Sequence, residues 1–97
     1  MIEVIQVSDH EPLCFRVTIQ DRRGSSQHEV TLASALWQRL AGGDPSAASF
    51  IEAVFAFLLD REPREAILER FDCAVIGRYF PEFETAIGAY LPHRSPP

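Results

Sequence analysis

The stretch that decides the fold is residues 46–61, Ser-Ala-Ala-Ser-Phe-Ile-Glu-Ala-Val-Phe-Ala-Phe-Leu-Leu-Asp-Arg. On a helical wheel of about 100° per residue, its apolar side chains cover more than half of the circumference. The preceding Asp44-Pro45 is typical of a helix start, because aspartate caps free N–H groups and proline fits the first turn. A helix this apolar must be covered on two sides. We therefore expect it to form the core, between a sheet and further helices.

The sheet is predicted from the residues before this helix. Residues 13–21 alternate strictly between apolar and polar side chains, and residues 27–32 alternate with His28 among the inward positions. A turn sequence around Gly24 separates them. The inward-facing residues have odd numbers in the first strand and even numbers in the second. The numbers of two directly paired residues must therefore add up to an odd number. Ile19 with His28 and Val17 with Val30 satisfy this rule across a four-residue loop, residues 22–25. Residues 2–7 are apolar enough for a third strand.

Short helices are predicted elsewhere. One covers residues 33–40 and ends at Gly42-Gly43, one begins at Pro63 and continues to Phe71, and the last begins at Pro81. Residues 73–80 favour helix over extended structure, although their apolar spacing is irregular. The predicted fold is therefore α+β: an N-terminal antiparallel β-hairpin of two or three strands, packed on a C-terminal bundle of four to five short helices. We expect one domain over residues 1–91 and a disordered tail over residues 92–97.

Composition and net charge limit the partners and the cellular location that we expect for this protein. The chain has 97 residues, 46% of them hydrophobic, which is enough for one core. A net charge of −5 argues against nucleic acid as a partner. Residues 50–59 are the longest apolar run, too short to cross a bilayer, and no signal peptide is apparent. We expect a cytoplasmic protein with no membrane contact. All nine basic residues are arginine, and lysine and asparagine are absent, which is typical of a GC-rich bacterial genome.

Catalytic and metal-binding patterns are weak. Ser25, Ser26, His28 and Glu29 are close in sequence, but adjacent strand residues point to opposite faces, so His28 and Glu29 cannot form a base–orienter pair. Cys14 and Cys73 have no CxxC spacing. His10 with Cys14 is the nearest half-site, and structural zinc usually takes four ligands. We therefore predict no catalytic, cofactor-binding or metal-binding residue and favour a non-catalytic role.

The most specific segments lie between residues 57 and 84. Leu59 with Arg61-Glu62-Pro63 forms a Leu-x-Arg-Glu-Pro segment, Ile67-Leu68 with Phe71 a second element, and Tyr79-Phe80-Pro81-Glu82 a third. Here the chain resembles a small uncharacterised bacterial protein family of unknown function. Phe83 stands where that family pattern has tyrosine. The resemblance covers roughly the last half of the chain and implies a shared fold unit, with no activity or cofactor attached to it.

These segments also supply the candidate interaction surface. Arginine and tyrosine are enriched at interface hot spots. The predicted surface consists of Arg61, Glu62, Arg64, Arg78, Tyr79 and Glu82. We interpret the protein as an interaction module that binds an unknown protein partner or self-associates, through this surface or a free sheet edge. Three alternatives stay open: an internal ion-pair network, a small-ligand pocket or unrecognised active site between the sheet and the apolar helix, and nucleic-acid contact at Arg22-Arg23.

Overall fold

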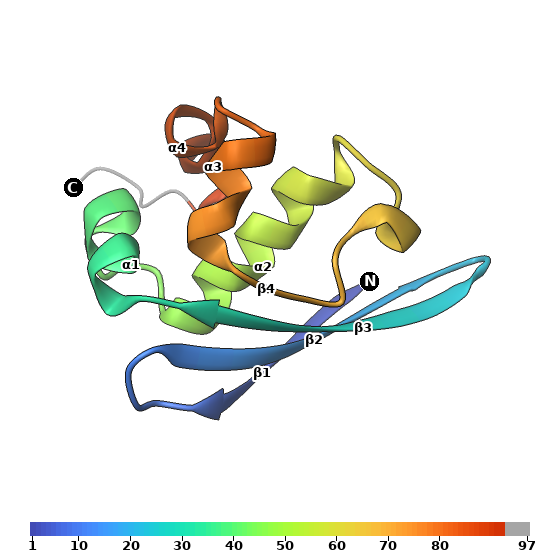
Figure 1. Ribbon diagram of the computed structural model, residues 1–97, viewed down its shortest axis with the longest axis horizontal. Coiled ribbons are helices and arrows are strands. Elements are labelled where there is room, and N and C mark those ends of the chain that lie inside the picture. Colours follow the sequence, from blue (N-terminus) through green and yellow to red (C-terminus); the bar gives the residue numbers. More distant parts are fainter. Residues whose placement is uncertain (93–97) are drawn as a thin grey trace.

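In the computed structural model, which describes residues 1–92, three strands lead into helices and a fourth, short strand follows. The prediction of an α+β fold is confirmed (Figure 1). The strands are β1 (Ile2–Ser8), β2 (Leu13–Asp21), β3 (Gly24–Leu32) and β4 (Arg70–Asp72). The α-helices are α1 (Ser34–Ala41), α2 (Ala47–Leu59), α3 (Ile76–Tyr79) and α4 (Phe83–Ala86). Three 3₁₀ turns complete the order: η1 (Arg64–Ala66), η2 (Cys73–Val75) and η3 (Ile87–Tyr90).

The sheet is larger than the predicted hairpin. Its strand order is β1-β2-β3-β4; the first three strands are antiparallel, and β4 runs parallel to β3. Figure 1 shows the helices gathered on one face of this sheet. The alternating pattern explains this arrangement, because the inward side chains of β2 and β3 are buried and the outward ones are largely polar.

The register obeys the predicted parity but differs from the example pairs. Val17 pairs with His28 and Ile19 with Ser26, so each sum is odd and two lower than expected. The reason is the turn, which has two residues between Asp21 and Gly24 instead of four. Gly24 adopts φ 141°, a conformation that favours glycine. The Asp21 carboxylate accepts a 2.8 Å hydrogen bond from the N–H of Arg23, which stabilises the short turn.

The long helix α2 forms the core, as its sequence predicts. Its eight buried residues include three phenylalanines, and they share one hydrophobic core with the inward side chains of β2 and β3. In Figure 1 α2 lies between the sheet and the C-terminal helices. The N-cap is Ser46, whose hydroxyl accepts from the N–H of Ser49; the predicted cap, Asp44, lies two residues earlier.

The predicted helix from Pro63 to Phe71 is wrong. Only η1 is helical there, and the chain then extends into β4. The N–H of Glu29 donates to the carbonyl of Glu69 over 2.8 Å, and Phe71 pairs with Val30. The edge of β3 thus supplies backbone partners that a helix would leave unused. The helices that follow are shorter than predicted, with four residues each in α3 and α4.

The expected helical structure of residues 73–80 is present over residues 73–79, and Phe80 caps its end. The Asp72 side chain accepts a 2.9 Å hydrogen bond from the N–H of Ala74 and so caps η2, which leads directly into α3. In the predicted disordered tail, residues 93–97 lie outside the described residues. Within residues 1–92, every helix is too short or too polar to cross a lipid bilayer.

Candidate functional site

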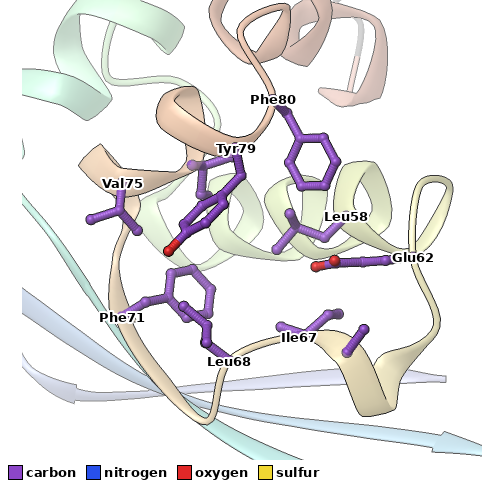
Figure 2. Close-up of a pocket in the computed structure, with 10 residues that line it drawn as sticks. Leu58, Glu62, Ile67, Leu68, Phe71, Val75, Tyr79 and Phe80 are labelled. Carbon is purple, nitrogen blue, oxygen red and sulfur yellow. The ribbon is translucent and has the colours of Figure 1, made fainter.

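A groove of about 330 Å³ opens beside the C-terminal end of α2 (Figure 2). The segment from η1 to β4 forms one side of it, and η2 with α3 forms another. We call it the Tyr79 groove. Its lining residues are Leu58, Glu62, Ala66, Ile67, Leu68, Phe71, Val75, Ile76, Tyr79 and Phe80. It therefore lies at the β4 end of the sheet, where the C-terminal segment folds back over α2.

Local sequence builds the walls of this groove. α2 ends at Leu59, and the chain becomes extended at Pro63 before the η1 turn. Pairing of β4 with β3 then places Phe71 beside α2, where its ring lies 5.8 Å from that of Phe55. The cap at Asp72 turns the chain into α3 and carries Tyr79 to the rim. Strand pairing and one capping residue thus position the two walls.

The floor of the groove is apolar and its rim is unusually exposed. Ile67 and Ile76 are buried, whereas Leu68 is 50% and Tyr79 is 66% exposed. Large apolar side chains that stay in water next to an apolar hollow mark a surface suited to a partner or a ligand. Figure 2 shows Glu62 and Tyr79 extending toward the middle of the ring of lining side chains.

Glu62 is the only carboxylate among the lining residues. Its side chain forms no hydrogen bond or ion pair with any other residue in 1–92. Burial raises the pKa of Glu62, because the apolar surroundings disfavour the charged form. An incoming positive charge or hydrogen-bond donor would relieve that cost, so the groove combines an apolar floor with one unmatched acceptor.

The structure divides the predicted interaction surface. Glu62 and Tyr79 line the groove, and Arg78 is exposed on α3. Arg64 is buried and pairs with Asp21 at the hairpin tip over 2.9 Å, so it joins two parts of the fold. Arg61 and Glu82 also pair with each other, at 2.9 Å.

The Arg61 pair belongs to an internal network. The Arg61 guanidinium lies 3.7 Å from the centre of the Phe57 ring and donates to the hydroxyl of Tyr90. That hydroxyl donates in turn to Asp60 over 2.6 Å. The hydrogen bond from Arg61 holds the pKa of Glu82 below its usual range. For these residues the geometry matches the ion-pair alternative, in which charges hold the C-terminal turns to α2.

Sequence reasoning missed a second arrangement at the groove. The Ser26 hydroxyl and His28 Nε2 are 2.9 Å apart, and His28 Nδ1 lies 2.8 Å from the carbonyl oxygen of Leu68. A carbonyl only accepts, so His28 Nδ1 carries a proton and donates to the Leu68 carbonyl. The i,i+2 spacing on one strand face was the available signal. His28 is only 4% exposed and packs on Phe55, so it fixes the Leu68 rim to β3.

The cysteines are free thiols in separate environments. Cys73 is buried, and burial raises the pKa of its thiol, whereas Cys14 is half-buried on β2. Residues 1–92 contain no group of three or more histidine, cysteine or acidic side chains arranged to hold a metal ion. His10 lies beside Asp9 and is fully exposed on the loop after β1.

Comparison with known proteins finds no matching family model, curated protein or solved structure. The resemblance noted in the sequence stays a prediction.

Proposed function

We propose that this protein is a non-catalytic interaction module whose Tyr79 groove binds a segment of a partner protein. The observation that carries the proposal is the combination of exposed Leu68 and Tyr79 at the rim with an unpaired carboxylate, Glu62, inside. Aromatic and aliphatic anchors in a concave site are typical of interface hot spots.

Charge defines the partner segment. The chain carries a net charge of −5, and Glu62 is unmatched among residues 1–92. A basic partner would meet a favourable field on approach, and its positive side chain would supply the partner that Glu62 lacks. Tyr79, Phe71 and Phe80 add aromatic faces that attract a cation. We therefore propose a segment in which an apolar anchor lies next to an arginine or lysine.

The three sequence segments that resemble the small bacterial family also support the Tyr79 groove as the binding site. The three motifs that resemble the small bacterial family meet at this groove, through Glu62 from the first, Ile67, Leu68 and Phe71 from the second, and Tyr79 and Phe80 from the third. As part of the proposal, the protein belongs to that family and works in the cytoplasm of a bacterium; the all-arginine composition favours the bacterial source.

Fluorescence anisotropy with short labelled peptides tests the proposal. Each peptide carries a leucine or phenylalanine flanked by arginine, and a matched peptide carries glutamate in place of the arginine. We expect the arginine peptides to bind about three- to tenfold more tightly, which corresponds to roughly 0.7–1.4 kcal/mol. Tyr79→Ala should weaken binding of both.

The control variants separate charge from fold. Glu62→Gln should remove the preference for arginine, whereas Glu69→Gln, the same change outside the groove, should preserve it. Equal binding of both peptide sets by the wild-type protein would contradict the role of Glu62. Stabilisation by small metabolites, with no peptide bound by the wild-type protein, would replace the proposal with the small-ligand alternative.

A further inference from the structure

The opposite edge of the sheet carries a second surface. β1 is a seven-residue edge strand that pairs only with β2 among residues 1–92. Figure 1 shows it at the outside of the sheet, away from β3. It contains no proline and one charged residue, Glu3, whereas natural edge strands are usually shortened or protected by charge, proline or a cover. Ile5 and Val7 are 51% and 46% exposed. Residues 2–6 of this edge therefore have few of the usual barriers to pairing, since the irregularity in the register of β1 lies after Gln6.

The ladder shows which backbone groups are free. The N–H of Gln20 donates to the carbonyl of Met1, and the Met1 amine donates back to the Gln20 carbonyl, so these two residues form a hydrogen-bonded pair. Such pairs alternate along an antiparallel ladder. The odd residues of β1 therefore bond to β2, and the backbone groups of Ile2, Val4 and Gln6 point away from the sheet.

These three residues are symmetric about Val4. A second antiparallel β1 strand, related by a two-fold axis at Val4, pairs Val4 with its own copy and Ile2 with Gln6 of the second copy. Each of the three pairs exchanges two bonds, or about six in all. The regular register of β1 covers these residues, since its irregularity begins only after Gln6.

Side chains on the face of the sheet that the helices do not cover are compatible with this symmetric pairing about Val4. Arg16 is the β2 neighbour of Ile5, and Thr18 is the neighbour of Glu3. In the symmetric pairing Glu3 lies beside Ile5 of the second copy, with that copy's Arg16 next in the row. Neither Glu3 nor Arg16 has an ion-pair partner in residues 1–92. The dimer therefore brings together two unpaired carboxylates and two unpaired guanidiniums across the isoleucines.

We propose that two copies of this chain associate through β1 and form one continuous eight-stranded sheet with its two-fold axis at Val4. β1 is roughly 24 Å long at about 3.4 Å per residue. This edge is smaller than the roughly 800 Å² per partner of standard interfaces, so we expect a weak dimer with a Kd in about the micromolar range. The Tyr79 groove lies near β4, at the other edge, and stays accessible in this dimer.

Sedimentation equilibrium over a concentration series tests the association. We expect a monomer–dimer equilibrium that Ile5→Glu shifts at least about tenfold toward monomer, because each new glutamate would lie directly opposite Glu3 of the second copy. Gln27→Glu places the same charge on the exposed face of β3 and should leave the equilibrium unchanged. A protein that stays monomeric up to about 1 mM, or an equilibrium that Ile5→Glu does not shift, overturns the proposal.

The register has its own test. Glu3→Arg alone and Arg16→Glu alone should each weaken the dimer, and the double variant should recover it, because opposite charges again lie on either side of Ile5. Isotope-filtered NMR on a mixture of labelled and unlabelled protein should show a contact between the Hα atoms of Glu3 and Ile5 of the second copy. Failure of the double variant to recover association, with no such contact, overturns the Val4 axis. Peptide binding at the Tyr79 groove is measured separately and does not depend on this result.

Discussion

The N-terminal strands and the C-terminal turns are stabilised in different ways. β1 to β3 form a regular antiparallel ladder in which backbone hydrogen bonds repeat along each strand. Residues 60–91 contain only helical turns and one strand of three to four residues each. Such short elements make few internal bonds, so they depend on side chains that attach them to the rest of the fold.

Three attachments can be identified. The Phe57 ring lies 5.1 to 5.9 Å from those of Phe83, Tyr90 and Phe80. The His28 ring bonds the carbonyl of Leu68, and Arg61 bonds Glu82. The ladder repeats its hydrogen bonds along each strand and should tolerate the loss of one contact, whereas the C-terminal turns depend on a few side-chain contacts and should not.

Removing the aromatic attachment should have the largest effect. Phe57→Ala deletes a fully buried ring that contacts three aromatic residues, and such substitutions cost about 3–5 kcal/mol. Urea unfolding would measure this loss in the free energy of unfolding. Tyr79→Ala, which removes an exposed ring from the same half of the chain, should stay within about 0.5 kcal/mol. Similar costs for both variants would mean that burial of Phe57 is not what holds the turns.

Breaking the His28 link should have an intermediate effect. His28→Leu leaves the Leu68 carbonyl without its side-chain donor, at a cost of about 1–3 kcal/mol. Ser26→Ala removes only the second bond of the ring and should cost about 0.5–1.5 kcal/mol. In the His28→Leu variant, hydrogen exchange should accelerate more at residues 67–70 than in strands β1 and β2. Uniform acceleration across the whole sheet would contradict the local role of His28.

Acid should weaken the charged attachment, with the smallest effect. The pKa of Glu82 is lowered in the folded protein by the hydrogen bond from Arg61, so its contribution is present above the unfolded pKa and is lost as pH falls through the folded pKa. Thermal unfolding should show a small fall in Tm for Glu82→Gln at pH 7 and a narrowing difference from wild type in acid. Glu52→Gln, on the exposed side of α2, controls for the loss of one charge. A difference that is constant with pH would exclude titration of Glu82 as the cause.

Part of the groove was predictable from the sequence. Glu62 and Tyr79 were expected on a surface because they are polar or aromatic residues near helix ends, and both line the groove. Leu68, Phe71 and Phe80 were not expected there, because apolar spacing alone does not distinguish a core face from a groove wall. Arg64 was expected on the surface, and its burial depends on Asp21, which is 43 positions away.

Local periodicity and capping determined the facing of β2 and β3, the burial of α2 and the helical start after Asp72, because each depends on neighbours within a few residues. The tertiary structure decided the rest. Residues 63–71 have a helical apolar spacing, yet β4 forms because the β3 edge offers backbone groups about forty residues earlier in the chain. The Tyr79 groove is a consequence of that pairing, since β4 holds Phe71 on one side of it and α3, which follows, brings Tyr79 to its rim.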